Sequence, residues 1–122
     1  MFIPDAVHRE LCHPAAPPHV REWATTLPAW VTVVDVEIRD DDTLHALDLA
    51  ERAAITLALS IHASLILIDE RKGTRAAISK GLEATGTLGV LSLAARRGMI
   101  TLADAFARLE QTNSRYWQEI LE

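Results

Sequence analysis

The stretch Leu65-Ile66-Leu67-Ile68-Asp69-Glu70-Arg71-Lys72-Gly73 decides the fold class of this chain. Four consecutive apolar residues bounded by polar ones predict a short strand buried on both faces, as in a parallel sheet. Asp69 and Glu70 follow where the strand should end, and open α/β sheets bind ligands beyond the carboxyl ends of their strands. A carboxylate there must be hydrated, paired or metal-bound, because an isolated buried charge is too costly. The alternative is a turn whose acids pair with Arg71 or Lys72.

Length and composition indicate one globular domain over residues 1–122. The 12 basic and 17 acidic side chains give a formal net charge of −5. This balance argues against a surface that binds nucleic acid everywhere, although it leaves room for a local basic patch. The single cysteine, Cys12, cannot form an internal disulfide, no apolar run is long enough to span a membrane, and no signal peptide is recognisable. We therefore expect a cytoplasmic protein without membrane partners.

Strand and helix patterns alternate along the chain. Strands are expected at residues 2–3, 30–36, 65–69 and 82–85. Helices are expected at residues 4–11, 18–27, 43–62 in two pieces that meet near Asp48, 71–80 before Gly81, 86–97 before Gly98, 101–111 and 114–121. Alternation of this kind predicts an α/β fold, with a parallel sheet covered by helices.

Two further acids are predicted to lie beside apolar faces. Helical geometry places Glu51 over apolar residues of its own helix, next to the core. The alternative for Glu51 is a first-turn acid stabilised by the helix dipole. Glu10 shares a helix face with apolar residues, and its alternative is an acid at a helix end that pairs with Arg9 or Arg21.

Glu10, Glu51 and Asp69 are thus three acids directed at a core or a strand end. Carboxylates that converge repel one another unless a cation lies between them. Oxygen-rich sites suit Mg²⁺ or Mn²⁺, and phosphodiester hydrolysis is a reaction often built on such sites.

Four segments carry a resemblance to a known family: residues 3–11, 47–55, 65–73 and 85–91. In order and spacing they resemble a prokaryotic branch of the PIN-domain superfamily, and the resemblance covers essentially the whole chain. It implies a three-layer α/β/α fold with a small parallel sheet. It also implies a nuclease related to the ribonuclease toxins of toxin–antitoxin pairs, which cut single-stranded RNA with Mg²⁺ or Mn²⁺.

The resemblance assigns roles to the acids. Glu10, Glu51 and Asp69 match family acids, so they would be catalytic and would hold the metal directly or through water. Glu70 is a further candidate metal ligand. The bound metal would activate water for attack on phosphorus.

Three basic residues follow these acids: Arg71, Lys72 and Arg75. They would form a local positive edge that meets the RNA backbone. Their alternative is a solvated helix face.

The chain departs from the family pattern at its start, since it begins after the central strand that carries the family's first acid. It therefore resembles an N-terminally truncated PIN domain, and Ala50 stands where the family usually has glycine before the acid. A late start codon, a degenerate domain and a dimer that covers the gap are three competing explanations. An exposed sheet edge favours a homodimer.

Three functions follow from these observations. The first is a ribonuclease toxin with a small antitoxin protein as partner. The second is a catalytically degenerate remnant that serves as a dimerising or regulatory binding module. The third is a small phosphate-binding regulator, which would bind an anion near Gly86 without cleaving RNA.

Overall fold

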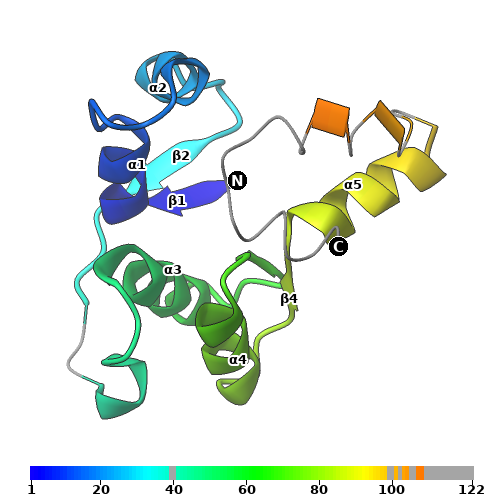
Figure 1. Ribbon diagram of the computed structural model, residues 1–122. Helices are drawn as coiled ribbons and strands as arrows, with labels where there is room; N and C mark the ends of the chain where they lie inside the picture. The colour runs from blue at the N-terminus through cyan, green and yellow to red at the C-terminus, as the bar shows by residue number, and fades with distance from the viewer. Residues whose placement is uncertain (39–40, 99–100, 102, 105–106, 109–122) are drawn as a thin grey trace. The chain divides into compact units, whose positions relative to one another are not determined.

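The computed structural model describes residues 1–38, 41–98, 101, 103–104 and 107–108. The chain divides into two compact units, Met1–Ala84 and Thr85–Glu122. Helices and strands alternate, which confirms the predicted α/β class (Figure 1). The elements are β1 (Phe2–Pro4), α1 (Asp5–Leu11), α2 (Pro18–Thr25), β2 (Thr32–Val34), the 3-10 helix η1 (Asp42–Leu44), α3 (Leu49–Ser60), β3 (Ile66–Leu67), α4 (Arg71–Ser79), β4 (Ala84–Thr85) and α5 (Thr87–Arg96).

The described strands form two separate two-stranded sheets. β1 pairs in parallel with β2, with Ile3 opposite Val33, and β3 pairs with β4. The N-terminal ammonium of Met1 donates a hydrogen bond of 2.8 Å to the carbonyl of Trp30, which continues the contact beyond β1. The strands predicted at residues 2–3 and 30–36 are therefore both present, as β1 and β2, although β2 is shorter than predicted.

Helix α3 forms the centre of the first unit. As predicted, the helical region breaks near Asp48, whose carboxylate caps α3 by accepting the backbone N–H of Glu51 at 2.9 Å. Ile55 is fully buried on this helix. It belongs to a core cluster that joins η1, α3, β3 and α4, made of Leu44, Leu47, Ile55, Ala58, Ile66 and Ala77.

The prediction that the apolar run before Asp69 is buried on both faces is wrong. Ile66 is 6% exposed, whereas Leu65 and Leu67 are 47% and 50% exposed. Successive side chains of a strand point to opposite faces. In the described part of the chain β3 belongs to a two-stranded sheet, and only its Ile66 face packs on the core cluster.

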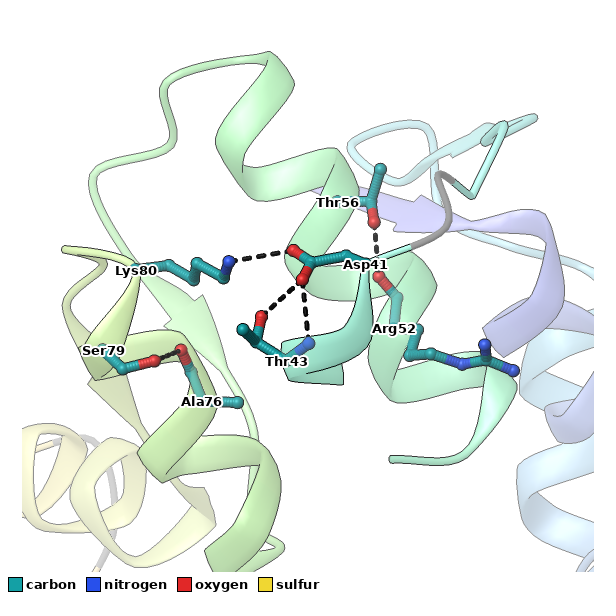
Figure 2. Close-up of polar contacts among 7 residues, drawn as sticks. All are labelled: Asp41, Thr43, Arg52, Thr56, Ala76, Ser79 and Lys80. Carbon is teal, nitrogen blue, oxygen red and sulfur yellow. Dashed lines mark hydrogen bonds and ion pairs between the residues drawn. The ribbon is translucent and has the colours of Figure 1, made fainter. Parts of the chain in front are cut away.

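A polar contact joins η1 to the end of α4 (Figure 2). The carboxylate of Asp41 accepts hydrogen bonds from the backbone N–H and the hydroxyl of Thr43, at 2.9 and 2.6 Å. Its other oxygen lies 2.8 Å from the ammonium of Lys80. These contacts lower the pKa of Asp41 to about 2, with the Lys80 hydrogen bond as the largest cause and the Thr43 bonds next. The ion pair between Asp41 and Lys80 thereby connects segments that are 39 residues apart in the sequence.

Glycines end two helices where the sequence places them. Gly81 follows α4 with φ of +86°, and Gly98 follows α5 with φ of +73°, a backbone region that favours glycine. In the second unit the hydroxyl of Thr101 accepts the N–H of Asp104 at 3.3 Å, as expected of a helix cap. The helix predicted at residues 114–121, and most of the helix predicted at 101–111, lie outside the described residues.

Candidate functional site

Glu51 is an acid of the first unit whose pKa is affected by three other acidic side chains. It lies in the first turn of α3 and is half-buried, as predicted. Burial is the main cause that raises the pKa of Glu51, and the negative charges of Asp48, Glu70 and Glu10 raise it further. Acids from α1, from the start of α3 and from the turn before α4 therefore each act on Glu51.

The Glu51 carboxyl group lies against the first turn of α4, close to Gly73. A Cβ atom placed on Gly73 would lie 3.6 Å from Cδ of Glu51. Gly73 is buried in the first turn of α4, where the positive end of the helix dipole favours nearby carboxylates. The α3 acid thus lies beside the amino end of the helix that follows Asp69 and Glu70.

The side chain of Glu70 caps helix α4, a role that the sequence analysis did not predict. Its Oε2 accepts the N–H of Gly73 at 2.9 Å, so it caps α4. Burial acts to raise its pKa, but hydrogen bonds from the backbone of Gly73 and Lys72, with the charges of Lys72 and Arg75, hold the pKa of Glu70 below its usual value. Glu70 and Glu51 are neighbours whose pKa values move in opposite directions.

The remaining predicted site residues are connected to Glu51 to different degrees, and the charge of Asp69 is not among the largest causes of the raised Glu51 pKa. Glu10 is exposed at the end of α1, rather than directed at the core, and its charge acts on Glu51. Asp69 is half-buried and lies in the short segment of sequence that links β3 to α4. Arg71, Lys72 and Arg75 are exposed along the first turns of α4, so the basic edge and the acid Glu70 adjoin.

The donor set fits a hard divalent cation in its chemistry. Carboxylate oxygens are the ligands that Mg²⁺ and Mn²⁺ prefer, and the repulsion at Glu51 is relieved when a cation lies between the acids. In the residues that the structure describes, no three Asp, Glu, His or Cys side chains are already arranged to hold an ion. Ligation would therefore require these side chains to close on the ion.

Asp48 is the site neighbour that the sequence interpretation missed. Its carboxylate caps α3 and adds negative charge beside Glu51. The signal was available, since Asp48-Leu49-Ala50-Glu51 is an acid cap followed three residues later by Glu, a pattern typical of helix starts. A helix-capping pattern and a metal-site pattern coincide here.

Fold and site together define an α/β domain with a cluster of acids beside a basic helix start. A family model described as a PIN domain matches residues 1–122, which include both units. The chain therefore belongs to the PIN-domain family, which is a family of nuclease-type domains. Comparisons with curated proteins and with solved structures gave no significant match. None of the described helices combines the length and apolar character needed to cross a membrane.

Proposed function

We propose that this chain is a metal-dependent endoribonuclease that cuts single-stranded RNA, the toxin half of a toxin–antitoxin pair. The observation that carries the proposal is the meeting of acidic charge at Glu51, which comes from three different segments of the first unit. Membership of the PIN-domain family supports the reaction class. The adjoining basic residues of α4 support a polyanionic substrate.

The acids would bind the metal ion. Glu10, Glu51 and Asp69, with Glu70 as a further ligand, would hold Mg²⁺ or Mn²⁺. The metal, when bound, supplies an activated water and stabilises negative charge on phosphorus. Glu51 keeps its proton to a higher pH than an ordinary glutamate, so its ionisation and cation binding are coupled.

The basic residues bind substrate rather than metal. Arg71, Lys72 and Arg75 contact the phosphates of the RNA backbone and fix its register on the acids. Lys72 and Arg75 also counter the charge of Glu70, so they hold the α4 cap in place when no RNA is bound.

The direct test incubates the full chain with labelled single-stranded RNA, in Mn²⁺ or in chelator. We expect cleavage only with the metal, and a loss on the order of 100-fold or more in Glu51→Gln. Glu22→Gln, an exposed glutamate on α2, is the matched control and should cleave as the wild type does. Wild-type protein that leaves RNA intact in Mn²⁺, or cleavage that survives both chelation and Glu51→Gln, would refute the proposal.

The protein partners follow from exposed surface and from the proposed role. Leu65 and Leu67 are exposed beside the unpaired edge that β3 has among the described residues, and such edges favour pairing between chains. We infer a homodimer and a small antitoxin protein as partners. A monomeric mass at high concentration, measured by sedimentation equilibrium, would exclude the dimer.

One observation favours a second candidate function. Because the described residues hold no preassembled group of metal ligands, a catalytically degenerate module that dimerises and binds without cutting is the alternative. It predicts a wild-type protein that binds single-stranded RNA or a protein partner but shows no turnover in Mg²⁺ or Mn²⁺.

A further inference from the structure

A shallow cavity beside Glu10, open to solvent, has no part in the roles given above. It has a volume of about 600 Å³ and lies between α1, the loop after α1 and the start of α3. This volume is in the range of small-molecule sites, and the wall is mostly apolar with a few polar groups, as such sites usually are. Its lining residues are Ala6, Arg9, Glu10, His13, Ala15, Ala16, Leu49 and Ala50.

Two lining residues are donors suited to an anion. Nδ1 of His13 accepts the backbone N–H of Ala15 at 3.0 Å, so the neutral ring carries its proton on Nε2 and can donate from there. Arg9 lies 3.5 Å from the carboxylate of Asp5, and its side chain is 69% exposed. A guanidinium has five N–H donors, so the pair with Asp5 is compatible with a second contact to a phosphate.

The rest of the wall suits a flat apolar ring. Leu49 is 49% exposed at the first position of α3, although it is a large apolar side chain. Four alanines leave space around it, and only Glu10 brings a negative charge to the cavity. A nucleobase can lie against such a surface, because apolar side chains accept its face without a hydrogen-bond code.

Glu10 connects this cavity to the acids of the candidate site. It lines the cavity, and its charge acts on Glu51. An occupant of the cavity therefore lies next to the acids. The mixture of phosphate donors with an apolar floor favours a nucleotide over an acidic peptide, which would need more cationic groups than these two.

We propose that this cavity binds one nucleotide of single-stranded RNA next to the phosphate that is cut, with Arg9 and His13 on its phosphate and Leu49 under its base. This proposal rests on the proposed ribonuclease function. It makes Arg9, His13 and Leu49 substrate-binding residues, whereas the reaction itself stays with the acids.

The test measures binding without turnover. Fluorescence anisotropy of a labelled oligouridylate of about ten nucleotides is recorded with the full chain in chelator. We expect His13→Ala and Arg9→Ala each to weaken binding by about three- to tenfold, as loss of a hydrogen-bonded contact does. His19→Ala and Arg97→Ala are exposed, matched controls outside the cavity and should bind as the wild type does.

A second arm separates base from phosphate. Leu49→Ala should weaken binding of the oligouridylate and leave binding of an abasic oligomer of equal length unchanged. In cleavage assays the same variants should raise KM and leave kcat unchanged. The proposal is overturned if His13→Ala, Arg9→Ala and Leu49→Ala bind the oligouridylate as tightly as the control variants do. It is also overturned if an excess of acidic peptide displaces RNA equally from wild type and from Arg9→Ala. Since anisotropy needs no cleavage, an inactive protein would refute the proposed function without deciding this one.

Discussion

Gly73 is the position where packing and the candidate site can be tested by one methyl group. A Cβ atom added there would overlap Cδ1 of Ile68, would lie 3.1 Å from Cγ1 of Ile68 and 3.6 Å from Cδ of Glu51. The contact with Glu51 is an ordinary one, whereas the overlap with Ile68 is not. Because Ile68 immediately precedes Asp69 and packs against the core cluster, Gly73→Ala perturbs both the fold and an acid of the site.

The magnitude follows from two opposed effects. The end of the Ile68 side chain must move by roughly 1 Å to restore ordinary contact, and overpacking of this kind costs about 1–3 kcal/mol. Replacing a helical glycine by alanine returns about 0.5–1 kcal/mol through backbone entropy. The difference lies between about 0 and 2.5 kcal/mol, so we expect Gly73→Ala to lower the free energy of unfolding by about 1 kcal/mol.

The assay is a double-mutant cycle by urea denaturation. Ile68→Val removes Cδ1 and should cost about 0.5–1.5 kcal/mol alone. Combined with Gly73→Ala it should cost less than the sum, by about 1 kcal/mol, because the overlapping atom is gone. Ile78→Val, at an isoleucine of α4 that is 58% exposed, is the control and should add independently to Gly73→Ala. Energies for Gly73→Ala and Ile68→Val that add to within about 0.3–0.5 kcal/mol would refute the overlap as the cause.

Three further predictions concern stability. Because the folded pKa of Glu51 is raised above its usual 4.5, its carboxylate destabilises the fold as pH rises through and above that value. In urea denaturation without metal, Glu51→Gln should thus have a larger free energy of unfolding than wild type near neutral pH, and an equal one well below pH 4.5. Mn²⁺ at about 100 times its Kd should add about 2.7 kcal/mol to the stability of wild type and nothing to that of Glu51→Gln. The folded pKa of Asp41 is lowered from 3.8 to about 2, so Asp41→Asn and Lys80→Met should lower the thermal midpoint above pH 3.8, and the deficit of Asp41→Asn should disappear as pH falls through 2. Ile55→Ala should cost about 2–5 kcal/mol and Ile55→Val about 0.5–1.5 kcal/mol, and equal losses in calorimetry would contradict the full burial of Ile55.

Local chemistry explains why the sequence predicts the helices well. Asp48 and Thr101 cap helices through their own side chains, and Gly81 and Gly98 adopt the positive φ that ends them. These signals act within a few residues, so a sequence reading finds them. The exposure of the apolar strand before Asp69 was not predictable in the same way, because a run of four apolar residues does not reveal how many layers cover it.

The candidate site was predictable in its residue types and less so in its connections. The sequence singles out Glu51 and Glu70 as candidates because acids at a helix start and after a strand are conspicuous. The capping bond from Gly73 to Glu70 and the contact between Asp41 and Lys80 were missed. Polar residues carry no hydrophobic period, so the half-buried pair of Asp41 and Lys80, 39 residues apart, cannot be recognised from the pattern of the sequence.

The two glutamates at the centre of the site differ in what their charge does to the fold. Glu70 is ionised at low cost, because α4 and two basic side chains stabilise its carboxylate, so it positions the helix whether or not a cation is bound. The charge of Glu51 is opposed by burial and by three other acids, so Glu51 is the group whose ionisation a cation would favour most. Environments that push neighbouring pKa values apart assign different roles to chemically identical side chains.

Glu70→Gln should consequently weaken α4 with or without Mn²⁺, whereas Glu51→Gln should abolish the stabilisation by Mn²⁺ and leave α4 intact. Hydrogen exchange of the α4 amides, measured with and without Mn²⁺, separates the two roles. Equal loss of protection in both variants would show that the acids act as one structural unit.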